Sequence, residues 1–137
     1  MTRSSMRAGF SLIEIMVVLT IMGLIIGFLV TNVASRLEKG RKETTISTLR
    51  VLEENIEAFY NDTGHHPEQL VDLIKKPANA EIAEKWEGPY LKSKNVPKDG
   101  WGKPFQYRQT SDDPEHEYEL YSNGSKKTKG PISVWNR

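Results

Sequence analysis

Hydrophobic residues are concentrated in one segment near the start of the chain. Between residues 10 and 30, 16 of 21 positions are hydrophobic, and residues 15–30 form an apolar run broken only by one Thr and two Gly. About 20 apolar residues allow a helix to cross the hydrocarbon core of a bilayer, which is about 30 Å thick. The pattern therefore predicts an apolar helix that is long enough to span a membrane.

Three interpretations of this segment compete: a membrane span, a secretory signal peptide and a buried core helix. A uniformly apolar core helix would need a large domain around it, which the rest of the chain cannot supply. Arg3, Arg7 and a small-residue cleavage site ending at Ser35 favour a signal peptide. However, the run is longer than a usual signal core and begins beside Glu14. A carboxylate in hydrocarbon costs about 2.5–3.5 kcal/mol, so we expect a retained span in which Glu14 has a function.

A second hydrophobic pattern follows the apolar run. It consists of apolar side chains at spacings of three, three, four and three residues, which indicates one face of an amphipathic helix: Ile46, Leu49, Leu52, Ile56 and Phe59. No Pro interrupts residues 10–60, and the turn residues at 61–64 provide a stop. We therefore predict one helix of about 50 residues, about 75 Å long at 1.5 Å per residue. Its second half packs against a small head.

The remaining chain is built from short pieces. Residues 68–74 predict a short second helix, and residues 79–87 predict a polar connection that is partly helical. Residues 104–108 and 118–121 alternate between apolar and polar side chains, which predicts an antiparallel hairpin joined through residues 109–116. The fold class is therefore α+β, with bulky aromatic side chains that pack the small sheet: Trp86, Tyr90, Trp101, Phe105 and Tyr107.

Composition narrows the classes of function. The 137 residues allow one domain, and 19 Lys and Arg against 18 Asp and Glu leave no broad basic surface for nucleic acid. The absence of Cys excludes disulfides and a Cys nucleophile. His65, His66 and His116 are interpreted as surface or turn residues, with a metal site from His66 and His116 as a weak alternative. No catalytic motif is present in the sequence, so we do not expect an enzyme.

Residues 7–14, with the sequence RAGFSLIE, stand directly before the apolar run. This segment resembles the class III signal of type IV pilins and pseudopilins. The resemblance implies that a prepilin peptidase cuts between Gly9 and Phe10, that Phe10 becomes an N-methylated terminus, and that Glu14 acts in assembly. Cleavage would create an amino group at Phe10, and Glu14 lies one helical turn away on the same face. The implied divisions are a leader at 1–9, a transmembrane and filament-core helix at 10–35, and a periplasmic head at 36–137.

Four further segments occur in the order found in the major pseudopilin of type II secretion systems: residues 64–67, 86–91, 99–107 and 118–124. This resemblance implies a type IV pilin-like fold and a subunit that polymerises with itself in the periplasm. It also implies minor pseudopilins and an inner-membrane assembly platform as partners, and a single-pass anchor in a bacterial inner membrane. The alternatives are a type IV pilus or competence pilin subunit and, in a different class, a small exported or membrane-anchored binding protein.

One loop departs from that family. Acidic residues after the Tyr-Ser-x-Gly segment bind calcium in the family, whereas here the loop contains Ser125, Lys126, Lys127 and Lys129 and no carboxylate. Calcium takes six to eight oxygen ligands, carboxylates among them, so we predict no metal and no other cofactor at this loop. Two roles for the lysines stay open. They form a solvated basic loop, or they replace the ion by pairing with one of four nearby carboxylates: Asp112, Asp113, Glu115 or Glu117.

Overall fold

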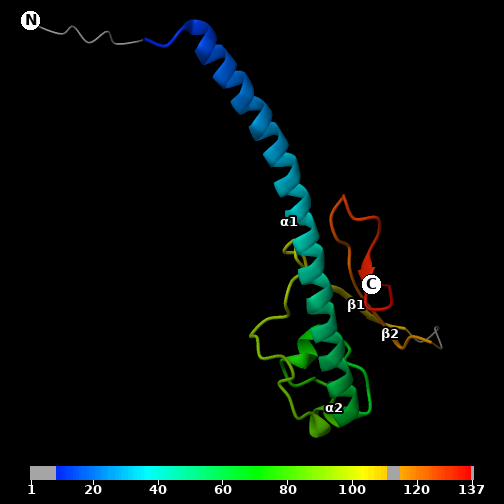
Figure 1. Ribbon diagram of the computed structural model, residues 1–137. Coiled ribbons are helices and arrows are strands. Elements are labelled where there is room, and N and C mark those ends of the chain that lie inside the picture. Colours follow the sequence, from blue (N-terminus) through cyan, green and yellow to red (C-terminus); the bar gives the residue numbers. More distant parts are fainter. Residues whose placement is uncertain (1–8, 111–114, 137) are drawn as a thin grey trace, which may run out of the picture. The chain divides into compact units, whose positions relative to one another are not determined.

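The computed structural model describes residues 9–110 and 115–136 (Figure 1). Its elements follow in the order α1 (Leu12–Thr63), η1 (Leu70–Leu73), α2 (Ala80–Lys85), β1 (Gln106–Gln109), β2 (Tyr118–Ser122) and β3 (Ile132–Ser133). The predicted α+β class is confirmed. The predicted leader, residues 1–9, lies outside the described residues except for Gly9.

Helix α1 is the dominant element and contains 52 residues. It ends at Thr63 and is followed by Gly64, whose φ of 75° lies in the left-handed region and whose N–H donates to the carbonyl of Tyr60 at 2.7 Å. Such a glycine satisfies a carbonyl that the last helical turn leaves without a partner. The long helix predicted from the two hydrophobic patterns is confirmed, and it ends three residues beyond the predicted Tyr60.

The chain divides into two compact units, Met1–Glu38 and Lys39–Arg137. In the described part of the first unit, the apolar side chains lie on the surface of α1. Phe10 is 84% exposed and Leu24 is 72% exposed. Even the least exposed of its large hydrophobic residues, Ile15, is 45% exposed, so this unit has no buried core among its described residues.

The second unit has a hydrophobic core built on the other half of α1. Leu49, Leu52, Ile56 and Phe59 are completely buried, and Ile46 packs partly buried against them. The predicted amphipathic face is thus confirmed as the core-facing side of the helix. Tyr107 of β1 packs partly buried against this core. Buried side chains from η1, α2, β2, β3 and the connecting segments complete it: Leu70, Leu73, Ile82, Leu91, Phe105, Tyr118, Leu120, Ile132 and Val134.

The sheet has the order β1-β2-β3, and both pairings are antiparallel. In the first pair Gln106 lies opposite Tyr121, so the predicted hairpin is confirmed. The central strand β2 buries alternate side chains, as expected for a strand with one face on a core. Strand β3 was not predicted, because its two residues are too short to show a period.

The two predicted helical pieces are short. The first is a 3₁₀ helix, η1. At its start the backbone N–H of Gln69 donates a hydrogen bond to the carboxylate of Asp72 at 3.0 Å. The second is α2, in which Asn79 accepts the N–H of Glu81. Both lie inside the predicted segments.

The predicted aromatic residues pack against the core, but two of them, Trp86 and Tyr90, contact helical segments rather than the sheet. Trp86 donates its indole N–H to the carbonyl of Asp72, and Tyr90 contacts Phe59 edge-on at 5.6 Å between ring centres. Tyr90 also donates to Asp62 at 2.7 Å. Burial, followed by this hydrogen bond, raises the pKa of Tyr90 to about 12. Phe105 and Tyr107 lie at the start of the sheet.

Candidate functional site

The N-terminal motif is positioned by the first turn of α1. The backbone N–H of Ser11 donates to Oε2 of Glu14 at 2.8 Å, so this carboxylate reaches back over the start of the helix. A side chain in this position satisfies one of the N–H groups that have no partner within the helix, and its negative charge interacts favourably with the helix dipole. Glu14 is therefore held beside the backbone of Ser11.

Gly9 and Phe10 precede this turn and are both exposed. A Cβ atom built on Gly9 would meet no atom within 4 Å, so nothing in the described chain requires a glycine there. The structure thus gives Gly9 no folding role. A small residue at this place suits a backbone that must enter the cleft of another protein.

The apolar half of α1 has the composition of a membrane span. Its most apolar 18-residue window has a mean hydropathy of 2.7, and none of that window is buried. Thr20, a polar residue within the run, donates its hydroxyl to the carbonyl of Met16 at 2.8 Å. Backbone and hydroxyl groups that bond within the helix are what a hydrocarbon environment demands.

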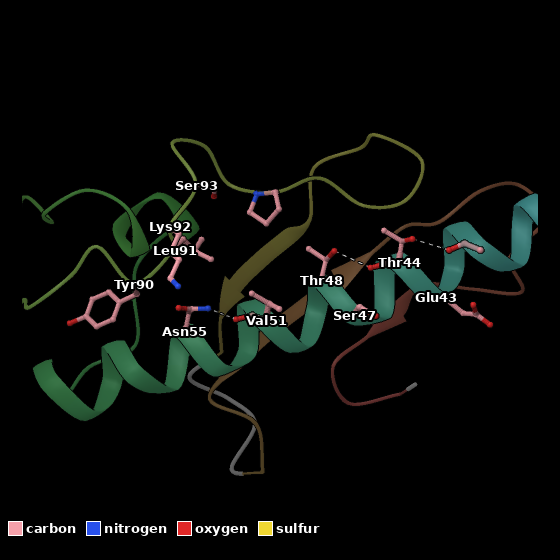
Figure 2. A pocket seen from close by; sticks show the side chains of 12 residues that line it. Glu43, Thr44, Ser47, Thr48, Val51, Asn55, Tyr90, Leu91, Lys92 and Ser93 are labelled. Carbon is pink, nitrogen blue, oxygen red and sulfur yellow. Dashed lines mark hydrogen bonds between the residues drawn. The ribbon is translucent and has the colours of Figure 1, made fainter.

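A groove of about 920 Å³ lies between α1 and the segment around residues 90–97 (Figure 2). Thr44, Thr48 and Asn55 project from α1 along this groove, and each donates to the backbone carbonyl four residues earlier. These three polar groups are therefore already bonded within the helix. The groove is also lined by Glu43, Ser47 and Lys92.

His66 and His116, the two histidines of the alternative metal site, have separate partners. His66 lies 3.0 Å from Glu117 and stacks on Tyr60 at 4.6 Å between ring centres, whereas His116 packs edge-on against Trp135 at 4.3 Å. In the part of the chain that the structure describes, no three His, Asp or Glu side chains are grouped to hold a metal ion. Burial lowers the pKa of His66 from 6.5, and the charge of Glu117 opposes this shift.

This arrangement predicts a pH effect on stability. The folded chain holds the pKa of His66 below its unfolded value, so protonation favours the unfolded state and stability falls as pH drops below about 6.5. Glu117→Gln removes the opposing charge and should lower the pKa of His66 further, which steepens the loss. Thermal unfolding of the full chain in detergent at neutral pH and at about pH 5.5 tests this. Glu119→Gln, which changes the partner of Arg108 instead, is the control. An equal pH dependence in both variants would contradict the prediction.

The loop after β2 is held by hydrogen bonds that sequence reasoning missed. The ammonium of Lys103 donates to the carbonyl of Gly124 at 2.9 Å, and the hydroxyl of Ser122 donates to Asp99 at 2.5 Å. Asp99 is buried, and an Asp beside the Gly-Trp-Gly turn was the one signal of a polar anchor in the sequence.

These contacts do not fit calcium. The carbonyl of Gly124 already accepts from an ammonium, and Asp99 accepts from two backbone N–H groups as well as from Ser122. Of the predicted carboxylate partners, Asp112 and Asp113 lie outside the described residues, and Glu117 lies against His66. Among the described residues, Lys126, Lys127 and Lys129 form no ion pair. The described part of the structure therefore shows no pairing of these lysines with Glu115 or Glu117, and their pairing with Asp112 or Asp113 stays a prediction.

Both the N-terminal segment and the head match known protein families. Residues 4–30 match the prokaryotic N-terminal methylation motif, and residues 32–133 match the family described as type II secretion system protein G. The fold resembles the crystal structure of the major pseudopilin from the type 2 secretion system of enterohaemorrhagic Escherichia coli. The TM-score is 0.59 at 21% identity, over 76% of this chain and 94% of that one. The long helix, the small sheet and the motif define a type IV pilin-like chain, as predicted.

Curated relatives make the assignment more specific. Type II secretion system core protein G of Vibrio cholerae is 32% identical over 115 residues, which is 82% of this chain and 77% of that protein. The protein of the same name from Xanthomonas campestris is 33% identical over 114 residues, 81% and 77% of the two chains. The chain belongs to the type II secretion system protein G family. This confirms the predicted secretion family over the pilus and competence alternatives.

Proposed function

We propose that the chain is made as a precursor, that a prepilin peptidase cleaves it between Gly9 and Phe10, and that the new amino group of Phe10 is methylated. The match of residues 4–30 to the methylation motif supports this. So does Gly9, which is exposed and has no packing role in the described chain.

The processed chain then polymerises into a periplasmic pseudopilus that supports protein export across the outer membrane. The observation that carries this proposal is the apolar half of α1, of which the most apolar window is entirely unburied. Burial of apolar surface stabilises a protein by about 25 cal/mol per Å². An exposed apolar area of this size must therefore be covered by lipid or by protein. Residues 10–35 serve as a membrane anchor before assembly and as the filament core afterwards.

The remaining partners follow from this assignment. Residues 36–137 form the periplasmic head of a single-pass inner-membrane protein, and minor pseudopilins and the inner-membrane assembly platform are the other components that the filament contacts. The head is a structural unit, with no enzymatic activity and no nucleic-acid ligand. In the groove of Figure 2, the side chains of Thr44, Thr48 and Asn55 bond to the backbone of α1, which supports a structural role for them.

The native N-terminus is the direct test. Mass spectrometry of protein purified from membranes should find a chain that begins with methylated Phe10. Gly9→Val, which places a branched side chain at the cut, should leave the precursor intact, whereas Gly40→Ala, a change far from the cut at another uncrowded glycine, should be processed normally. A native chain that begins at Arg36 would instead identify an ordinary signal peptide and end the proposal.

A further inference from the structure

Two segments that are distant in sequence, the turn at residues 99–103 and the end of β2, meet at the start of the C-terminal loop. Ser122, the last residue of β2, is completely buried, and its hydroxyl donates to Oδ2 of Asp99 at 2.5 Å. The same hydroxyl oxygen accepts the N–H of Gly124 at 3.0 Å. A serine hydroxyl has one proton to donate and two lone pairs, so both contacts are compatible. The loop is therefore tied to the turn at residues 99–103.

Asp99 is a buried carboxylate with several donors. Its Oδ1 accepts the backbone N–H groups of Trp101 and Lys103 at 3.0 and 2.8 Å, while Oδ2 accepts from Ser122. A buried carboxylate is stabilised only when such donors surround it. Its oxygens are thus used within the protein to fix the turn that carries Lys103.

Lys103 extends from this turn to the loop. Its ammonium donates to the carbonyl of Gly124 at 2.9 Å, although much of the side chain remains exposed. The loop beyond is closed on itself, because Thr128 accepts the N–H of Ser125 at 2.8 Å and donates back to the carbonyl of the same residue. Gly124 has a φ of 62°, and a Cβ there would lie 2.3 Å from the hydroxyl of Thr128.

We propose that the ammonium of Lys103 is the cation of this loop and takes the place of the calcium ion that the family resemblance implies. Backbone carbonyls are common calcium ligands, and here such a carbonyl is bound by a lysine instead. A lysine ammonium is a compact charge on a flexible stem, which suits a single carbonyl. The head therefore holds its C-terminal loop closed without a metal ion.

Trypsin provides the test, because Lys126, Lys127 and Lys129 lie in the loop itself. Lys103 precedes Pro104 and is a poor trypsin site, so Lys103→Met changes the contact without changing the cleavage map. Lys76 also precedes a proline and is exposed, and Lys76→Met is the matched control. The full chain in detergent is digested briefly, and cleavage within residues 125–131 is followed by mass spectrometry. The expected rise for Lys103→Met is about fivefold, since opening no longer breaks a charge-assisted hydrogen bond.

Two further measurements distinguish the ammonium from a metal. Lys103→Arg keeps a cationic donor and should be cleaved at close to the parent rate. Millimolar calcium or a chelator should leave the cleavage rate of the parent chain unchanged. Protection of the parent by calcium would overturn the proposal, as would equal cleavage of Lys103→Met and Lys76→Met. None of these outcomes depends on filament assembly, so failure here and failure of the proposed function are separable.

Discussion

Replacing Glu14 with Ala should abolish filament formation while the protein stays in the membrane and is still processed. The apolar helix is unchanged by this substitution, so insertion should be normal or slightly improved, because a carboxylate in hydrocarbon costs about 2.5–3.5 kcal/mol. The proposed cleavage after Gly9 would create a protonated amine at Phe10. Glu14 is then the nearby carboxylate that can pair with this amine, or with that of a neighbouring subunit, as each chain enters the filament.

The hydrogen bond from Ser11 to Glu14 allows a sharper control. Glu14→Gln keeps a side-chain oxygen that can accept the Ser11 N–H, but it removes the charge. If the carboxylate only caps the helix, Gln should assemble and Ala should fail. If its charge sets the register of assembly, both variants should fail. The filaments are counted by electron microscopy and the membrane fraction by immunoblot, and normal filaments from both variants would remove the proposed role of Glu14.

The long helix could be predicted because its signals are dense and local. Each turn of α1 between residues 46 and 59 contributes a core residue at helical spacing, and Gly64 marks the end. The hairpin was predictable for the same reason, since β2 alternates buried and partly buried side chains. These features are readable within a short window of sequence.

Strand β3 and the anchor of the C-terminal loop could not be predicted in this way. Ile132 and Ser133 become a strand only because they pair with the edge of β2 that β1 leaves open. The N–H of Val134 also donates a hydrogen bond to the carbonyl of Leu120 in β2. The bond between Asp99 and Ser122 joins residues 23 positions apart. Gly9, Phe10 and Glu14, by contrast, form one contiguous motif. The candidate site at the N-terminus was therefore predictable, and the polar network of the head was not.

Gly100→Ala should be among the most destabilising single changes in the head. A Cβ at Gly100 would lie 2.1 Å from the carbonyl oxygen of Arg41 and 2.7 Å from its carbonyl carbon, which are backbone atoms of α1. Backbone inside a packed helix cannot move aside as a side-chain tip can. Overpacking costs about 1–3 kcal/mol, and displacement of the turn would also break the hydrogen bond from the N–H of Gly100 to Thr45. We expect a total loss of about 2–4 kcal/mol in the free energy of unfolding, measured by urea denaturation of the full chain in detergent.

Two control variants separate the causes of that loss. Thr45→Val removes the hydroxyl that binds Gly100 without adding a clash, so it should cost only about 1–2 kcal/mol. Gly40→Ala adds the same methyl group to α1 where no atom lies within 4 Å, and should stabilise the helix by up to about 1 kcal/mol. If Gly100→Ala costs no more than Thr45→Val, the close backbone approach is not what holds the turn. Because Asp99 and Lys103 belong to the same turn, a displaced Gly100 should also open the C-terminal loop to trypsin, whereas Gly40→Ala should not.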